Sequence, residues 1–287
     1  MNTVKIKKHS GELEAFDINK LINSLRRSQA DEGLVQQVAH NIVEQIEEGM
    51  TTKTIYQKAF NMLKRKSRIS ASKYKLKKAL LELGPTGFPF EKLVGKLLEF
   101  EGFNTQVGVI VDGNCVSHEV DVIAEKGDDI YMIECKFHSD QGRICNVKTP
   151  LYVQSRFLDI KERWKSQNGN GTKLYRGGLY TSTRFTSDAI KYGTCVDLIL
   201  VSWDYPQKGS LKERIDNTGM YPLTALATLT KYEKNKLLDK GIVLCKEIYE
   251  NPILLEQLGL SKSRQKKIME DSLELCKTVN AMDGGIV

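Results

Sequence analysis

The chain has 287 residues, of which 40% are hydrophobic and 28% charged, so it can form packed cores and has the length for two or three domains. Its six cysteines are scattered without a C-x-x-C pair, which argues against a zinc ribbon or a disulfide framework. No apolar run reaches the length of a membrane span and no signal peptide opens the chain, so we expect a cytoplasmic protein with no membrane partner.

The net charge of +7 is concentrated at the N-terminal end. Residues 1–84 hold 16 Lys or Arg against 9 Asp or Glu, whereas residues 85–222 hold 17 against 18. The span Asn61–Leu80 contains eight basic residues and no acidic one. Such a cluster suits the phosphates of a nucleotide or a nucleic acid, and it equally suits a solvated helix face. Both interpretations stay open at this point.

Residues 1–84 predict a small hairpin followed by four helices. Val4–His9 alternates apolar and basic residues like a short strand, and Gly11 marks a turn. Asp17 is a plausible N-cap of the first helix, and Thr51 or Thr52 of the third. The fourth helix opens at Ser70 and is stopped by the pair Gly84-Pro85.

Several stretches of this segment follow a known pattern: Ile6-Lys-Lys-His-Ser-Gly11, Glu14-Ala-Phe-Asp17 with Lys20, and Thr52-Lys-Thr-Ile55. In this order they resemble the ATP-cone, a nucleotide-sensing module of ribonucleotide reductases and of the repressor of their genes. The one departure is His9-Ser10, where Arg-Asp is usual. The resemblance implies that ATP or dATP binds between the hairpin and the helices as a regulatory effector. The residues that it implies for this binding are Lys8, His9, Glu14, Lys20 and Thr52.

Residues 85–222 predict alternating helices and strands. A linker, Pro85–Pro89, leads into a helix from about Phe90 to Phe100 that carries Glu91 near its start. The predicted strands after it are Phe103–Val111, His118–Ala124, Ile130–Lys136, Gly177–Thr183 and Val196–Ser202, with helices at Thr149–Trp164 and Phe185–Ile190.

The strands His118–Ala124 and Ile130–Lys136 contain acidic residues within apolar sequence, joined by a polar turn. Such carboxylates are costly unless they are paired or bind a cation. Because strand side chains alternate, Glu134 and Lys136 point to one face, and Asp121 can join them if the strands pair as a hairpin. Two carboxylates and an ammonium suit a Mg²⁺-dependent phosphodiesterase. The alternative is that Lys136 is simply the ion-pair partner of ordinary strand charges.

Asp121 followed by Glu134-Cys-Lys136, with Glu91 on the preceding helix, resembles the core of PD-(D/E)XK nucleases in their Mrr-like restriction endonuclease branch. The Phe-Thr-x-x-Ala helix between the last two strands extends this resemblance to Trp203. It implies a DNA endonuclease with a role in defence. Asp121 and Glu134 would bind Mg²⁺ or Mn²⁺ with the main-chain carbonyl of Cys135. Glu91 would complete the metal shell, and Lys136 would orient water and stabilise charge.

Residues 223–287 predict helices throughout. Leu258-Gly-Leu-Ser261 resembles the hairpin of a helix-hairpin-helix DNA-binding motif, while plain packing or oligomerisation explains the same pattern equally well.

We therefore expect an α+β multi-domain protein with an ATP-cone at 1–84, a restriction-endonuclease-like mixed sheet at 85–222 and helices at 223–287. The expected function is DNA cleavage that is regulated by ATP or dATP. We expect the active protein to be a homo-oligomer. The alternative is a non-catalytic, nucleotide-responsive protein that binds DNA or controls assembly.

Overall fold

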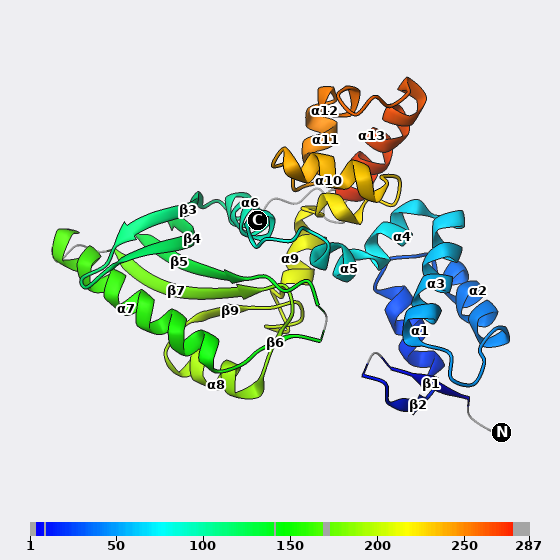
Figure 1. Cartoon of the computed structure of the whole chain (residues 1–287), viewed down its shortest axis with the longest axis horizontal. Coiled ribbons are helices and arrows are strands. Elements are labelled where there is room, and N and C mark those ends of the chain that lie inside the picture. Colours follow the sequence, from blue (N-terminus) through cyan, green and yellow to red (C-terminus); the bar gives the residue numbers. More distant parts are fainter. Residues whose placement is uncertain (1–3, 9, 141, 169–172, 278–287) are drawn as a thin grey trace.

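The computed structural model describes residues 4–8, 10–140, 142–168 and 173–277, apart from the side chain at position 168. These residues form three lobes: an N-terminal lobe, a lobe built around a sheet, and a C-terminal helical lobe (Figure 1). Within the described residues, no helix combines the length and apolar character that crossing a membrane requires.

The N-terminal lobe begins with the predicted hairpin, β1 (Lys5–Lys7) and β2 (Leu13–Ala15), whose strands pair antiparallel. Asp17 caps the first helix as predicted, since its carboxylate accepts a hydrogen bond from the Asn19 amide. Thr51 is the cap of the third helix, which leaves Thr52 as its first residue. The helices are α1 (Ile18–Arg26), α2 (Glu32–Glu44), α3 (Thr52–Lys66) and α4 (Arg68–Tyr74).

The predicted fourth helix differs from the structure, because it is two helices. It starts earlier, at Arg68, and is interrupted after Tyr74; α5 (Leu76–Leu81) follows with Lys75 between the two. The Lys75 backbone keeps helical angles, φ −78° and ψ −10°, so the interruption is a local bend. Its ammonium group reaches the C-terminal lobe, where it donates to the Thr224 carbonyl.

The sheet lobe contains a five-stranded mixed sheet in the order β3-β4-β5-β7-β9. The first three strands are antiparallel, and β7 and β9 continue parallel to β5. The strands are β3 (Asn104–Asp112), β4 (Ser117–Lys126), β5 (Asp129–Lys136), β7 (Leu174–Thr181) and β9 (Ile199–Val201). A separate pair of two-residue strands is β6 (Ile144–Cys145) and β8 (Arg184–Phe185).

Helices cover both faces of this sheet. On one face α6 (Phe88–Phe100) buries its predicted stripe, Leu93, Val94, Leu97 and Leu98. It starts inside the predicted linker, at Phe88. Pro89 is tolerated there because amides in the first turn of a helix have no hydrogen-bond partner within the helix, so the amide hydrogen that proline lacks is not needed. On the other face lie α7 (Lys148–Asn168) and α8 (Ser187–Cys195), whose apolar side chains pack with Ile130 and Met132.

The C-terminal part is helical, as predicted. It comprises the 3₁₀ turn η1 (Leu223–Ala225), α10 (Lys231–Asp239), α11 (Lys246–Glu250), α12 (Ile253–Glu256) and α13 (Lys262–Cys276). The helix α9 (Leu211–Thr218), which precedes it, was not predicted. Leu223–Leu229 is largely a turn where a helix was predicted. The segment Leu258–Ser261 does join two helices, α12 and α13.

The buried side chains divide into three hydrophobic cores. One lies within the N-terminal lobe, from Ile6 to Tyr74, and a second lies under α7 and α8. The third joins α5, α6 and one sheet face with residues from Leu211 to Leu275. The C-terminal helices therefore share their core with the sheet lobe, on the face that carries α6.

Candidate active site

Asp121 and the end of β5 are brought together by the antiparallel pairing of β4 and β5. Val122 pairs with Ile133, which places Asp121 beside Glu134 at the end of the ladder. The Asp121 carboxylate accepts a hydrogen bond of 2.6 Å from the Cys135 amide. The predicted hairpin and the predicted position of Asp121 are both confirmed by this geometry.

Asp121 lies where the ladder between β3 and β4 is interrupted. Pairs run up to Val107–Val122 and resume at Val109–Val120, so the register sets Asp121 opposite Gly108. Gly108 has φ +65°, a conformation that glycine adopts without steric cost. On either side of the interruption, Val120 and Val122 pack into different cores. The bend therefore takes Asp121 out of the regular inward–outward alternation.

Glu134 and Lys136 lie on the same face of β5, as the alternation predicts. The Lys136 ammonium donates to one Glu134 oxygen at 2.6 Å. Burial acts to lower the pKa of Lys136, but the hydrogen bond and charge of Glu134 raise it above its usual value. Lys136 is therefore a cation at neutral pH. Cys135 points the other way, into the core beneath α6, as predicted.

Arg156 on α7 holds the second oxygen of Glu134 through its guanidinium group, and it also donates to the main-chain oxygen of Glu119. The side chains of Arg156 and Glu134 are only 12% and 6% exposed. This buried pair fixes the carboxylate of β5 against the helix that covers the sheet. Both oxygens of Glu134 thus have cationic partners in this arrangement.

Glu91 lies in the first turn of α6 and is half-buried beside the same group of charges. Burial and the negative charges of Asp121, Glu119 and Glu134 raise its pKa to about 7. The pKa of Asp121 is raised to about 6, first by burial and then by Glu134. The structure therefore brings together all four residues, Glu91, Asp121, Glu134 and Lys136, that the sequence indicated.

Burial, and then the charges of neighbouring carboxylates, disfavour the ionised forms of Glu91 and Asp121. A divalent cation such as Mg²⁺ or Mn²⁺, which prefers oxygen ligands, would relieve this. Among the described residues, no group of three or more His, Cys, Asp or Glu side chains is placed to hold a metal. A cation here would need main-chain or water oxygens beside the carboxylates, and it would compete with Lys136 or Arg156 for Glu134.

Three of the residues expected to bind nucleotide, Lys8, Glu14 and Lys20, lie close together at and beside the hairpin. Glu14 forms ion pairs with Lys8, at 2.5 Å, and with Lys20. Lys7 bridges to Thr51, which brings the start of α3, and Thr52 with it, beside β1. His9 lies outside the described residues. Lys8, Glu14 and Lys20 are thus gathered, with their charges largely paired to one another, and nucleotide binding by them stays a prediction.

Comparison with known proteins identifies the family. The AF1548-like, C-terminal family matches residues 221–276. An uncharacterised protein of Archaeoglobus fulgidus is 33% identical over 180 residues, which are 62% of this chain and 97% of that protein. The chain belongs to the AF1548-like family.

Two solved structures are similar to this AF1548-like protein. The crystal structure of AF1548, a protein of unknown function, is 31% identical, with a TM-score of 0.54 over 67% of this chain and 98% of that one. MspJI restriction endonuclease in complex with a 27-mer oligonucleotide is 15% identical, with a TM-score of 0.32 over 60% and 35% of the two chains. The second similarity is too low to support any argument about function.

Arg156 is the site residue of this AF1548-like protein that the sequence analysis missed. A signal was present, because Val153, Arg156, Phe157 and Ile160 have the spacing of one helix face. A lone cation within an otherwise apolar stripe needs a buried anion as its partner. Glu134, at the end of the adjacent strand, is that anion.

Proposed function

We propose that this protein is a metal-dependent endonuclease that hydrolyses DNA phosphodiester bonds, with a nucleotide bound by the N-terminal lobe as its regulator. The observation that carries the proposal is the convergence of Glu91, Asp121, Glu134 and Lys136 from two strands and a helix on one place. The resemblance of these residues to the Mrr-like PD-(D/E)XK core supports the same reaction.

In this proposal each side chain has a defined task. Asp121 and Glu134 would hold the cation together with the Cys135 carbonyl, and Glu91 would add negative charge beside it. When bound, Mg²⁺ or Mn²⁺ supplies Lewis-acid stabilisation of the phosphate charge. Lys136, a cation at neutral pH, orients the attacking water and stabilises charge on the phosphate oxygens. Arg156 positions Glu134 without touching the substrate.

Plasmid cleavage with Mg²⁺ or Mn²⁺ tests the catalytic part. We expect wild-type protein to cut, and Asp121→Asn, Glu134→Gln and Lys136→Met to lose at least about 100-fold of the rate, because each removes a charge from the site. Glu125→Gln is the matched control, since Glu125 is an exposed carboxylate on the same strand as Asp121. Cleavage that persists in all three site variants would disprove the assignment.

Cleavage measured with and without ATP or dATP tests the regulatory part. We expect Lys20→Ala to abolish the response to nucleotide while metal-dependent cleavage remains, because Lys20 lies in the N-terminal lobe, far along the chain from the catalytic residues. Equal rates with and without nucleotide in the wild-type protein would remove regulation from the proposal and leave the enzyme.

One observation favours a second, non-catalytic function. Both oxygens of Glu134 are held by cations, Lys136 and Arg156, which is also what a purely structural ion-pair network looks like. In that case the protein would bind DNA or control assembly in response to nucleotide. DNA binding without cleavage at any concentration of Mg²⁺ or Mn²⁺ would select this function over the nuclease.

A further inference from the structure

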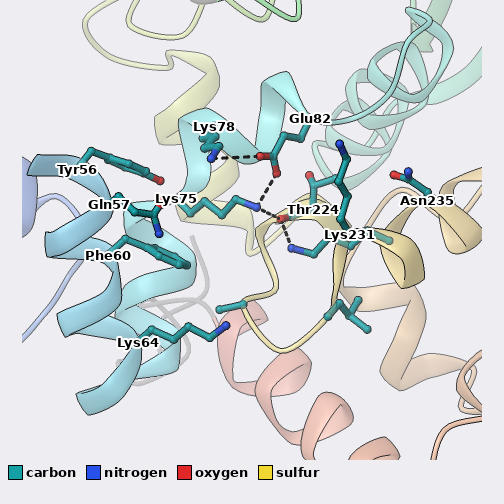
Figure 2. A pocket seen from close by; sticks show the side chains of 13 residues that line it. Tyr56, Gln57, Phe60, Lys64, Lys75, Lys78, Glu82, Thr224, Lys231 and Asn235 are labelled. Atoms are coloured by element: carbon teal, nitrogen blue, oxygen red, sulfur yellow. Dashed lines mark hydrogen bonds and ion pairs between the residues drawn. The ribbon is translucent and has the colours of Figure 1, made fainter. Parts of the chain in front are cut away.

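A cavity of about 470 Å³ lies between the N-terminal lobe and the C-terminal helices, away from the candidate active site. One wall comes from α3, which contributes Tyr56, Gln57 and Phe60, and Figure 2 shows these side chains on the opposite side from Thr224 and Asn235. Its remaining lining comes from Lys75, Lys78 and Glu82 in and beside α5, from the segment between Thr224 and Leu229, and from α10. The lining residues from Thr224 onward are more than a hundred positions along the chain from those of α3 and α5.

Five lysines line this cavity, whereas Glu82 is the one acidic residue among the described residues of the lining. The lysines are Lys64, Lys75, Lys78, Lys231 and Lys234. Glu82 pairs with Lys75 at 2.5 Å and lies 3.7 Å from Lys78 (Figure 2). One carboxylate cannot neutralise five ammonium groups, so the cavity has a large excess of positive charge.

The two deepest lysines point at the same oxygen. Lys234, 6% exposed, donates to the Thr224 carbonyl at 2.7 Å, and Lys75 donates to the same carbonyl at 3.2 Å. Burial, and then the charge of Lys75, lower the pKa of Lys234 to about 7. Two ammonium groups held this close with so little negative charge beside them repel each other. An anion entering the cavity would relieve this repulsion.

The opposite wall offers groups for the rest of a ligand. The Tyr56 hydroxyl is buried and lacks a hydrogen-bond partner among the described residues. The Tyr56 ring stacks on Tyr74, with ring centroids 5.1 Å apart, and leaves Phe60 and the amide of Gln57 on the cavity wall. An aromatic surface beside an amide suits a flat polar ring, while the lysines suit phosphate.

An adjoining cavity is also lined by basic residues, and its two arginines have carboxylate partners. It shares Lys64 with the first and is also lined by Arg68 and Arg264. These two arginines have carboxylate partners, Asp271 at 2.7 Å and Glu233 at 2.8 Å. In the first cavity, by comparison, Lys75 and Lys78 share the single carboxylate of Glu82, and Lys234 has no carboxylate partner among the described residues.

We propose that the cavity lined by Lys75, Lys78, Lys234 and Tyr56 binds a compact polyphosphate group, either free or carried by a nucleotide. A DNA duplex does not fit this role, because its phosphates contact exposed side chains, whereas Lys234 and Lys75 are reached only by a group that enters the cavity. The volume lies in the range of small-molecule sites.

The lining of this site does not include Lys8, Glu14 or Lys20, and the proposal does not depend on the nuclease proposal. Its ligand would contact α3 and α5 on one side and η1 and α10 on the other. Binding would therefore favour the arrangement in which these elements are packed together, which gives a direct route to regulation.

Calorimetric titration and thermal unfolding of the full chain test the proposal. The probes are inorganic triphosphate, ATP, and adenosine as an uncharged control. We expect both phosphates to bind and to raise Tm, and adenosine to do neither. Tighter binding of ATP than of inorganic triphosphate would identify a nucleotide as the natural source, and equal binding would identify the free group. Binding of neither phosphate would overturn the proposal.

Three variants locate the binding. Lys234→Met should fold with an unchanged or higher Tm, because it removes a buried charge, and should weaken triphosphate binding roughly tenfold or more. Lys78→Met, whose side chain is 45% exposed, gives the same test with little risk to folding. Lys236→Met, exposed on the same helix as Lys234, is the control and should bind like the wild type.

Lys20→Ala distinguishes the two sites. Triphosphate binding that this change abolishes, and that the Lys234 and Lys78 variants leave intact, would place the ligand at the hairpin and contradict the proposal. Binding of a DNA oligonucleotide in the absence of any triphosphate binding would contradict it too, since it would assign the lysines to a nucleic-acid surface.

Discussion

Arg156 is the residue on which the position of Glu134 depends, and Arg156→Met tests this. The change leaves a Glu134 side chain that is 6% exposed with Lys136 as its remaining cation. We expect it to lower the free energy of unfolding by roughly 2–3 kcal/mol, because it breaks a buried ion pair. If the protein is the proposed nuclease, cleavage should also fall roughly 10- to 100-fold, since Arg156 orients a metal ligand. Urea unfolding and plasmid cleavage measure the two effects.

Arg163→Met is the matched control for Arg156, because Arg163 is exposed on the same helix. It should change the free energy of unfolding by less than about 0.5 kcal/mol. Equal effects of the two substitutions would show that the contact between Arg156 and Glu134 does not stabilise the fold.

Single residues also show how far sequence reasoning reaches. Alternation along a strand predicted that Glu134 and Lys136 share a face and that Cys135 is buried, and all of this is confirmed. Alternation fails at Asp121, because the ladder is interrupted opposite Gly108. A glycine inside a strand is a sign of such a bend. Gly108 lies in β3, however, and that it affects Asp121 in β4 becomes known only from the pairing of the two strands.

At the scale of elements, the contact between the ends of α9 and α13 makes a sharp prediction about Gly219. Gly219 follows α9 with φ +69°, and an added Cβ would lie 2.2 Å from the main-chain oxygen of Cys276. Gly219→Ala should therefore destabilise the protein by clearly more than the ~1–2 kcal/mol of left-handed strain alone, because backbone must move. Thermal or urea unfolding measures the difference.

Gly259→Ala supplies the reference for this prediction. Gly259 also has φ +69°, but nothing lies within 4 Å of the Cβ that it would gain. It should cost only the strain, about 1 kcal/mol. Identical losses at the two positions would mean that the ends of α9 and α13 are not packed as closely as described.

The elements themselves were largely predictable, and their ends less so. Apolar strands bounded by turn residues located β4 and β5, and the stripe Leu93–Leu98 located α6. The helix that was expected to open at Ser70 is divided at Lys75, whose side chain bonds to Thr224 in another lobe. Such a tertiary contact has no counterpart in local periodicity.

At the scale of the whole molecule, the packing of the three lobes was beyond the sequence analysis. Charge counts located the basic span Asn61–Leu80, yet both interpretations of it were left open. The structure separates its members by their surroundings: Lys75, paired with Glu82, lines the cavity beside buried Lys234, whereas Arg68 pairs with Asp271 on α13. That distinction depends on partners about 150 or more residues away, which only the fold brings near.

The pair Arg68–Asp271 offers a test of how firmly the N-terminal and C-terminal lobes are joined. Arg68 on α4 donates two hydrogen bonds, of 2.7 and 3.0 Å, to Asp271 on α13. A double-mutant cycle with Arg68→Ala and Asp271→Ala, measured by urea unfolding, should give a coupling energy of about 1 kcal/mol. The value is modest because the Arg68 side chain is 39% exposed and partly screened by solvent.

The same cycle on Lys266 and Glu270, an exposed pair within α13, is the control and should give less than about 0.5 kcal/mol. A coupling energy at Arg68–Asp271 no larger than this would mean that the ion pair does not hold the lobes together. The larger value would establish a direct link between them. The proposed polyphosphate cavity lies between the same two lobes, so a bound polyphosphate should stabilise their packing. By the same coupling, the Arg68→Ala and Asp271→Ala variants should bind triphosphate more weakly than the two control variants.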